Sequence, residues 1–275
     1  MIANLLKRPI RALLRAGGLE IRRLRPVEDG DRPFSMPATL DRARALGLAP
    51  ATVVDVGAAF GTFARECAAV FPTARYLLVE PLSECLPSLQ ALARELRRAD
   101  VFPGAAGTAA GERVLHVHPD LGGSSFFEEH EDSDVNGVPR VVAVETVDAL
   151  VARTGAAGPF LIKVDTQGAE LEVLAGATVT LQRTEMVIAE VSLFRFFAGG
   201  PLLHDVVAFL RSSGFVVYDV AGHLRRPLDG ALAQLDLVFV REDGPFRQHH
   251  EYATRAQRDA QTRAFQAARP STREE

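Results

Sequence analysis

The sequence is poor in cysteine, with only Cys67 and Cys85 among 275 residues. Both lie in segments predicted to be helical, and their separation matches neither a metal-binding motif nor a disulfide framework. A reducing, cytoplasmic setting is therefore expected. Long apolar runs are also lacking, since none reaches the roughly 20 residues that span a membrane. Pro9 and Arg11 interrupt the basic N-terminus, so no signal peptide is expected.

An excess of basic residues is absent too. The net charge of −4 argues against nucleic acid as a partner. Hydrophobic residues make up 47% and charged residues 24%, which is typical of a soluble globular protein. The length suits one large domain with small additions. We expect an N-terminal helix and linker at 1–49, an α/β domain at 50–242 and a polar tail at 243–275.

Residues 1–26 have the pattern of a basic amphipathic helix. Apolar residues recur at helical spacing, and basic residues such as Arg8 and Arg15 fill the other face. Such a helix can lie on an anionic membrane surface, which would make the protein membrane-peripheral. Alternatively, the helix docks on the domain and keeps its charges in water. Pro9 breaks this short helix and makes it a weak anchor, which favours docking.

Strand and helix patterns alternate through most of the chain, which predicts a mostly parallel seven-stranded sheet with helices on both faces. The final two strands are joined by a short connection, so an antiparallel edge strand is expected. The predicted strands are 52–56, 75–80, 100–102, 160–165, 185–191, 215–220 and 235–240. The predicted helices end near residues 71, 98, 152, 174 and 212.

The middle of the chain departs from this rhythm. Residues 113–117 and 141–144 resemble a pair of strands, and 120–137 forms a long acidic loop between them. The loop contains the run Gly122-Gly123-Ser124-Ser125. Long loops in compact domains are often functional lids. A solvated loop without a binding role is the alternative.

A glycine-containing turn follows the first predicted strand. Gly57 allows a tight turn, and Gly61 allows a ligand to approach the helix start. The dinucleotide fingerprint needs glycines where this chain has Ala59 and Thr62, and no P-loop Gly-Lys-Ser/Thr follows. Asp55, two residues before Gly57, suits a ligand with a cationic amino-acid end, because its carboxylate attracts an ammonium group.

Glu80 ends the second strand, about twenty residues after the glycine turn. An acid at this place can accept hydrogen bonds from both hydroxyls of an adenosine ribose. Pro81 follows and favours the start of the next helix. Alternatively, Glu80 is only a helix-capping charge. The acid alone therefore does not indicate a ribose site, and the prediction depends on its spacing from Asp55 and Gly57.

The segment from Lys163 to Glu170 is a third candidate region. Asp165 is expected at the carboxyl end of its strand, where ligands bind in open α/β sheets. Lys163 lies two residues earlier on the same side of the strand and needs a partner in an apolar environment. Glu190 is the next acid expected at this rim. A purely structural salt-bridge network is the alternative.

These motifs resemble the FkbM family of S-adenosylmethionine-dependent methyltransferases over about residues 50–242. The resemblance rests on Asp55–Phe63, Glu80-Pro81, Gly122–Ser125, Thr146–Leu150, Lys163–Glu170 and Glu190–Ser192. It implies a Rossmann-like class I fold and, usually, O-methylation of a sugar, glycan or secondary metabolite. The implied cofactor is S-adenosyl-L-methionine. The residues expected to bind it are Asp55, Gly57, Ala58, Phe60, Gly61, Thr62, Glu80, Pro81, Ala105 and Asp165.

The catalytic group remains open among three acids. Asp165, Glu170 or Glu190 could remove the proton of an acceptor hydroxyl. A magnesium ion held by Asp165 and Glu190 is an alternative, although no His, Asp and Glu set has clear metal-ligand spacing. His204 is a weaker candidate for the base. The competing functions are a cofactor-binding protein without catalysis and a nucleotide-dependent oxidoreductase.

Overall fold

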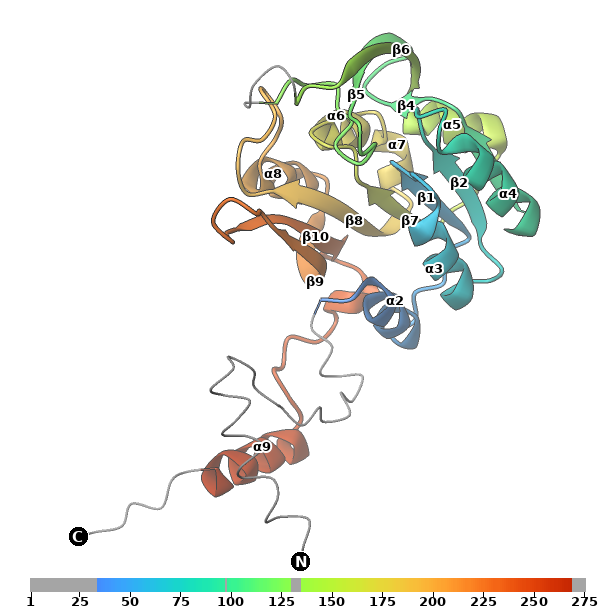
Figure 1. Ribbon diagram of the computed structural model, residues 1–275. Coiled ribbons are helices and arrows are strands. Elements are labelled where there is room, and N and C mark those ends of the chain that lie inside the picture. Colours follow the sequence, from blue (N-terminus) through green and yellow to red (C-terminus); the bar gives the residue numbers. More distant parts are fainter. Residues whose placement is uncertain (1–33, 97, 130–134, 269–275) are drawn as a thin grey trace, which may run out of the picture.

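The computed structural model describes residues 34–96, 98–129 and 135–268 (Figure 1). The expected amphipathic helix at 1–26 lies outside these residues. These residues form two sheets, a large one of seven strands and a small one of three. Within the described ranges, no helix combines the length and hydropathy that crossing a bilayer requires.

The large sheet confirms the prediction of a mostly parallel seven-stranded sheet. Its order is β3-β2-β1-β7-β8-β10-β9. The first five strands in this order run parallel, whereas β10 is antiparallel to both of its neighbours. The strands are β1 (Thr52–Val56), β2 (Arg75–Val79), β3 (Ala99–Phe102), β7 (Phe160–Val164), β8 (Thr184–Ser192), β9 (Phe215–Arg225) and β10 (Leu232–Arg241).

The antiparallel edge pair is also confirmed, with one detail that the sequence pattern left open. The strand that opposes the sheet is β10, which lies between β8 and the outermost strand β9. The chain first builds outward from β1 to β3, then returns to place β7 on the other side of β1. This reversal between β1 and β7 is the place where open α/β sheets bind ligands.

Helices cover both faces of the large sheet, as the alternating pattern predicted. On one face lie α2 (Met36–Ala45), α3 (Thr62–Val70) and α4 (Leu86–Leu96). On the other face lie α5 (Val147–Thr154), α6 (Glu170–Ala175), α7 (Thr178–Leu181) and α8 (Leu203–Ser212). Every residue of β1 and β7 is buried, because each packs against apolar side chains from both layers.

The small sheet lies above the carboxyl ends of the parallel strands (Figure 1). It contains β4 (Ala105–Ala106), β5 (Gly111–Val117) and β6 (Val138–Glu145), with β6 in the centre. The expected pair at 113–117 and 141–144 is confirmed as the antiparallel pair β5 and β6. The sequence pattern did not indicate that these strands form a sheet of their own. Their inner face packs with Leu82 and Cys85 into a third apolar cluster.

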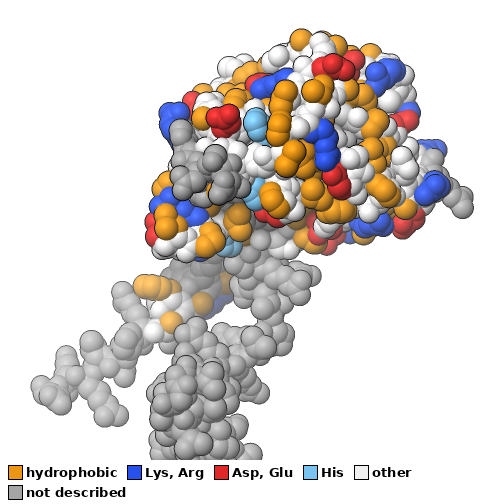
Figure 2. Space-filling view, turned by 45° about the horizontal axis from the view of Figure 1, so that its top comes forward, with side chains coloured by type: hydrophobic (Ala, Val, Ile, Leu, Met, Phe, Trp, Pro, Cys, Tyr) orange, Lys and Arg blue, Asp and Glu red, His pale blue; other side chains and the backbone are white. Residues whose placement is uncertain are grey.

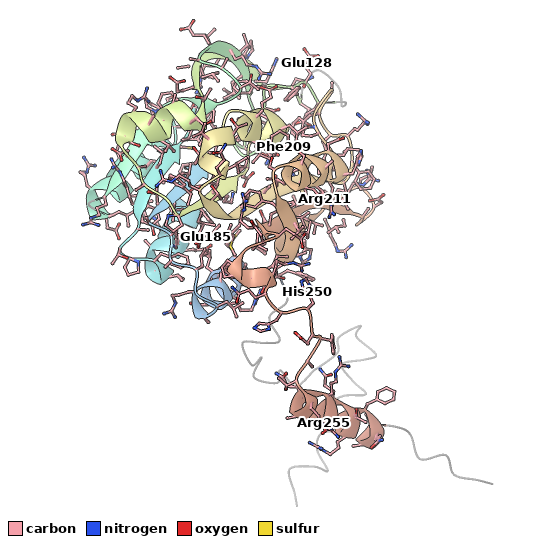
Figure 3. All side chains as sticks on the ribbon, turned by 180° about the vertical axis from the view of Figure 1, so that it is seen from behind. Glu128, Glu185, Phe209, Arg211, His250 and Arg255 are labelled. Carbon is pink, nitrogen blue, oxygen red and sulfur yellow. The ribbon has the colours of Figure 1, made fainter. Side chains whose placement is uncertain are left out.

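The C-terminal tail contains α9 (Arg255–Ala267), in which no residue is buried. The capping box of Thr254 and Gln257 defines its start. Figure 3 shows Arg255 and His250 at the opposite end of the molecule from Glu128, which belongs to the loop beside the small sheet. The tail therefore lies far from the carboxyl ends of the parallel strands.

Candidate functional site

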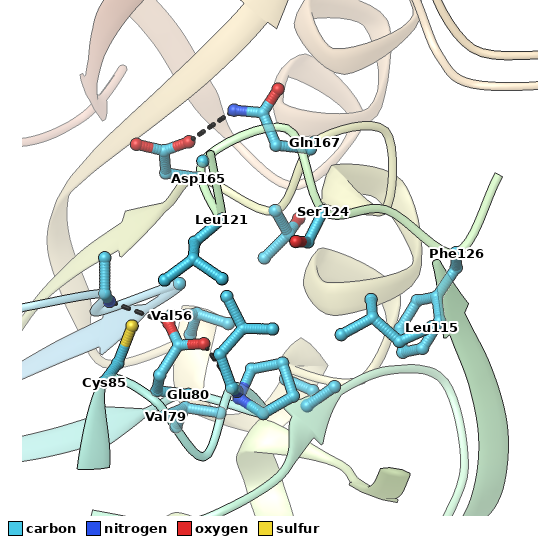
Figure 4. A pocket seen from close by; sticks show the side chains of 18 of the residues that line it. Val56, Val79, Glu80, Cys85, Leu115, Leu121, Ser124, Phe126, Asp165 and Gln167 are labelled. Atoms are coloured by element: carbon cyan, nitrogen blue, oxygen red, sulfur yellow. Dashed lines mark hydrogen bonds between the residues drawn. The ribbon is translucent and has the colours of Figure 1, made fainter. Parts of the chain in front are cut away.

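A cavity of about 330 Å³ lies at the reversal point of the large sheet. Its floor is formed by the carboxyl ends of β1, β2 and β7, and its roof by the small sheet and the loop that follows β5 (Figure 4). Ligand pockets in proteins measure about 300 to 1,000 Å³. The cavity is therefore large enough for a small organic ligand.

Gly57 forms the turn at the end of β1 and lines the cavity. Its φ is +80°, and a Cβ atom there would lie 1.8 Å from the backbone oxygen of Asp165. No side chain fits, so the two loops that follow β1 and β7 can approach only because residue 57 is glycine. Gly61 has φ +81° and starts α3, where a Cβ would press on Leu92.

Glu80 lies at the end of β2 with its carboxylate beside the glycine turn. One oxygen accepts a hydrogen bond from the amide of Ala59 at 2.7 Å, and the other accepts one from the amide of Leu82 at 2.8 Å. Burial raises the pKa of Glu80, and the two amide bonds oppose that rise. Each carboxylate oxygen has two lone pairs, so Glu80 retains acceptor capacity for a ligand in the cavity.

The roof of the cavity is largely apolar. Leu115 projects from β5, and Leu121 and Phe126 come from the loop that follows it. None of these three residues was predicted to belong to the site, because their approach to the cavity depends on how the small sheet packs over the large one. In Figure 2, the face that includes this roof shows hydrophobic side chains among scattered acidic and basic ones, with no continuous basic surface on the part described.

Ser125 ties the loop after β5 to the turn after β7. Its hydroxyl donates to the backbone oxygen of Gln167 at 2.6 Å and accepts from the amide of Phe127 at 3.0 Å. The side chain is buried, and the backbone of Ser125 also pairs with His116. Several residues of Asp120–Phe126 line the cavity, while the role of 120–137 as a lid stays a prediction.

Asp165 reaches the cavity from the end of β7. Its carboxylate accepts from the ammonium of Lys163 at 2.6 Å and from the side-chain amide of Gln167 at 3.1 Å. Lys163 thus has the partner that its apolar strand was expected to require. Burial disfavours the charge of Lys163, but Asp165 and Asp55 outweigh that cost and raise its pKa.

Glu190 lies at the same rim on β8 and also lines the cavity. Its Oε2 accepts from the side-chain amides of Gln167 and Gln234, each at 2.7 Å. Burial raises the pKa of Glu190 to about 9, and the charges of Asp165 and Asp236 act in the same direction. Gln167 therefore connects the two carboxyl groups, a role that was not predicted from the sequence.

Asp55 lies below the glycine turn rather than in the cavity wall. Its side chain is fully buried, and neither carboxylate oxygen has a hydrogen-bond partner. Burial raises its pKa to about 7, although the ammonium of Lys163 pulls the pKa down. Asp55 and Lys163 are register partners on β1 and β7, which explains this electrostatic contact.

The structure brings many, but not all, of the expected site residues to the cavity. Those that line it are Gly57, Phe60, Glu80, Pro81, Ala105, Asp165 and Glu190. Among the described residues, the lining does not include Asp55, Ala58, Gly61, Thr62 or Glu170. Glu170 instead accepts hydrogen bonds from the amides of Gly168 and Thr166, which stabilise the turn before α6. His204 is exposed, with 70% of its side-chain surface accessible.

The carboxylates considered for a magnesium ion are bound by N–H donors of the chain. Lys163 and Gln167 bind Asp165, while Gln167 and Gln234 bind Glu190. Across the part of the chain that the structure describes, no group of three or more His, Cys, Asp and Glu side chains is arranged for a metal ion.

The fold and the cavity define a Rossmann-like α/β protein with a cavity at the reversal point of its sheet. More specifically, the chain belongs to the FkbM methyltransferase family: the methyltransferase FkbM domain matches residues 55–217, more than half of the chain. The resemblance inferred from the motifs is thus confirmed. No curated protein matches the chain.

Solved structures with a similar fold include methyltransferase FkbM from Methylobacillus flagellatus KT. The identity is 18% and the TM-score 0.44, over 69% of this chain and 43% of that one. Another is the 1,6-didemethyltoxoflavin-N1-methyltransferase of Burkholderia thailandensis, with bound 1,6-didemethyltoxoflavin and S-adenosylhomocysteine. Here the identity is 13% and the TM-score 0.41, over 87% of this chain and 88% of that one. The chain thus spans less than half the length of the Methylobacillus protein.

Proposed function

We propose that this protein is an S-adenosylmethionine-dependent methyltransferase that acts on a hydroxyl group of a sugar, glycan or secondary metabolite. The observation that carries the proposal is that a possible cofactor site and a pair of acidic side chains line the same cavity. Gly57 and Glu80 form a nucleoside-type cradle, and Asp165 and Glu190 lie at the rim beside it. Membership of the FkbM methyltransferase family supports the same reaction class.

The residues present fit the proposed cofactor. Glu80 offers a buried carboxylate with lone pairs left for the two hydroxyls of a ribose. Gly57 lets the loops after β1 and β7 approach each other, and this close approach forms the floor of the cavity. Leu82, Leu115 and Phe126 give the cavity apolar surface for a purine ring. When bound, the cofactor would supply a methyl group that is already activated by a positively charged sulfur.

The acceptor is proposed to lie beside Asp165 and Glu190, because these side chains line the cavity beyond the cradle. A hydroxyl group must lose its proton as it is methylated, so a carboxylate within hydrogen-bond distance can act as the base. Lys163 and Gln167 fix the orientation of Asp165. The walls of the cavity position the acceptor and limit the access of water, which favours transfer to the bound hydroxyl.

The proposal is tested first by calorimetry. We expect S-adenosylmethionine and S-adenosylhomocysteine to bind, and NAD not to bind, because the glycine turn lacks the dinucleotide pattern. Incubation with labelled S-adenosylmethionine and fractionated host extract, followed by mass spectrometry, then identifies any product that gains a methyl group. Binding of NAD without binding of S-adenosylhomocysteine would contradict the proposal. Cofactor binding without any methylated product would favour a non-catalytic binding protein.

The Glu80→Ala variant tests the cradle directly. It should weaken S-adenosylhomocysteine binding by about 1.5 to 3 kcal/mol, the scale of hydrogen bonds to a charged group. Asp148→Ala is the matched control, because Asp148 also accepts from two backbone amides, those of Val179 and Thr180, but lies outside the cavity. Both variants should lose some thermal stability, and only Glu80→Ala should lose affinity. Equal affinity in both variants would mean that Glu80 is only a capping charge.

A further inference from the structure

Asp165 and Glu190 lie side by side at the ends of two neighbouring parallel strands. They directly follow Val164 of β7 and Ala189 of β8, which are register partners. Corresponding positions on adjacent strands point to the same face of a sheet. The two carboxyl groups therefore share one side of the cavity that both residues line.

One side-chain nitrogen links these two carboxyl groups. Nε2 of Gln167 donates to Oδ1 of Asp165 at 3.1 Å and to Oε2 of Glu190 at 2.7 Å. Because both oxygens bond to the same nitrogen, they lie within about 6 Å of each other. A single small ligand can therefore contact both carboxyl groups at once.

Within the described chain, Glu190 is anchored through one of its two oxygens. Its Oε2 accepts from the side-chain amides of Gln167 and Gln234, each at 2.7 Å. Oε1 receives no donor from the described residues, and it does not belong to their fully buried side-chain atoms that lack a partner. Since Glu190 lines the cavity, Oε1 is open to a ligand there.

Asp165 is bound at both oxygens but keeps acceptor capacity. Its Oδ2 accepts from the ammonium of Lys163 at 2.6 Å, and Oδ1 accepts from Gln167. A carboxylate oxygen has two lone pairs, so Oδ1 can accept one further hydrogen bond. The positive charge of Lys163 balances the negative charge of Asp165, and the pair does not by itself call for a cationic ligand.

A hydroxyl group matches the open oxygen of Glu190 whether or not that carboxyl group holds a proton. A hydroxyl donates to a carboxylate and accepts from a carboxylic acid, whereas an ammonium group can only donate. Burial raises the pKa of Glu190 to about 9, which favours the protonated form at neutral pH. This side of the cavity thus suits an uncharged ligand with hydroxyl groups better than an amine.

We infer that the methyl acceptor carries two hydroxyl groups on adjacent ring carbons, as sugars do, and that Glu190 determines specificity by binding the second one. This inference rests on the proposed function. Hydroxyls on adjacent carbons project from one edge of a ring and can meet Asp165 and Glu190 together, whereas those on opposite carbons point apart. An acceptor without the second hydroxyl leaves Oε1 of Glu190 unpaired, and sites built to bind a hydroxyl discriminate strongly against ligands that lack it.

The first hydroxyl is the one that is methylated, at Asp165. Its oxygen bonds to the methyl carbon while the carbon–sulfur bond of the donor breaks. The electron pair of that bond stays on sulfur, which becomes an uncharged thioether, and the hydroxyl proton passes to the carboxylate. The second hydroxyl keeps its proton and orients the first. Gln167 and Gln234 are positioning residues, because they act through the carboxyl group that they hold.

Binding of simple ring alcohols tests the inference without turnover. The protein is saturated with S-adenosylhomocysteine, EDTA removes any metal ion, and ligand-observed NMR gives the affinities. The probes are cis- and trans-cyclohexane-1,2-diol, trans-cyclohexane-1,4-diol, cyclohexanol and 2-aminocyclohexanol. We expect one of the two 1,2-diols to bind about tenfold more tightly than the 1,4-diol and cyclohexanol, the scale of one added hydrogen bond to a charged group.

The probe series separates failure of this inference from failure of the proposed function. Equal affinity of the 1,2-diols and cyclohexanol would overturn the inference, as would tighter binding of 2-aminocyclohexanol than of both 1,2-diols. Absence of saturation by either 1,2-diol up to its solubility limit would also overturn it. In each of these cases, binding of S-adenosylhomocysteine leaves the cofactor assignment intact. Failure of S-adenosylhomocysteine to bind would instead contradict the proposed function.

Variants of Glu190 test the second contact. Glu190→Met removes both oxygens and should abolish the preference for the 1,2-diol, whereas Glu190→Gln should keep part of it, because an amide also bonds to hydroxyls. Glu185→Met is the matched control, since Glu185 is a half-buried acid on the same strand, β8, outside the cavity lining. All three should bind S-adenosylhomocysteine as the wild type does. An undiminished preference in Glu190→Met would overturn the role of Glu190. Melting curves check folding, and the wild-type probe affinities decide the inference if that variant does not fold.

Discussion

The side chain of Asp165 combines a structural contact with a position in the cavity. It binds Lys163 at 2.6 Å and lines the space beside Glu190. Breaking a buried ion pair costs about 3 to 5 kcal/mol because it leaves one charge without a partner. A loss of activity on substitution could therefore reflect either stability or chemistry, and the two must be measured separately.

The Asp165→Asn variant makes this separation. The asparagine keeps the size of the side chain and can still accept from Lys163, so the cofactor should bind within about tenfold of the wild type. Methyl transfer per cofactor-loaded molecule should fall by about 10² to 10⁴, the usual contribution of a positioned acid–base group. Single-turnover rates and melting curves are the measurements. Normal turnover per loaded molecule, with a lower melting temperature, would move the catalytic role to Glu190.

For single residues, the sequence predicted which acids lie near the cavity better than it predicted their side-chain contacts. Glu80 and Asp165 were found because acids at strand ends meet at one edge of a parallel sheet. The absence of Asp55 from the cavity wall was not predicted; Asp55 lies within β1, where every residue is buried, while the turn at Gly57 packs against the backbone of Asp165. Gln167 escaped notice because its role depends on Asp165 and Glu190, which come from two different strands.

Among the structural elements, the segment from Asp120 to Phe127 is the one that closes the cavity. It is held at Ser125, whose hydroxyl joins the backbone of Gln167 to that of Phe127. A further contact is the side chain of Arg113, which stacks on Phe126 and pairs with Glu172. The roof and the rim are therefore mechanically connected through residues on β5, α6 and the turn after β7.

The Ser125→Ala variant should loosen this segment. Two hydrogen bonds are lost, one to the backbone oxygen of Gln167 and one from the amide of Phe127, so the cost should be about 1 to 3 kcal/mol. Hydrogen exchange of residues 118–127 should quicken, and S-adenosylhomocysteine affinity should fall. Ser213→Ala is the control, because Ser213 donates to the backbone oxygen of Phe209 on α8 and does not line the cavity. Unchanged exchange in 118–127 would show that other contacts suffice to hold the segment.

The periodicity of the sequence predicted most strands and helices, but it did not predict how all of the strands assemble into sheets. β5 and β6 were expected as a pair, yet their union with β4 over the cavity depends on contacts with Leu82 and Cys85 from another part of the chain. The helix that Pro81 was expected to start begins instead at Leu86. The turn before Leu86 contains Leu82, whose amide donates a hydrogen bond to Glu80 at 2.8 Å.

On the scale of the whole molecule, all described residues that line the cavity lie between Val56 and Glu190 in the sequence. The N-terminal arm and the tail contribute no residue among those described. The order of the large sheet explains why this region suffices, since β1 and β7 are neighbours in space although about a hundred residues separate them in the chain. Cofactor binding is therefore expected to be a property of the domain at 50–242.

Deletion of residues 1–26 tests this expectation. The truncated protein should bind S-adenosylhomocysteine with the affinity of the full chain, because every described lining residue is retained. If the basic face of 1–26 contacts membranes, the deletion should also abolish sedimentation with anionic liposomes, and neutral liposomes should not sediment either form. Replacing Lys7, Arg8, Arg11 and Arg15 by glutamine should reproduce that loss, because attraction to anionic lipid depends on charge. Equal sedimentation of all forms would favour docking of the segment on the domain, and a loss of cofactor affinity on deletion would contradict the boundary at residue 50.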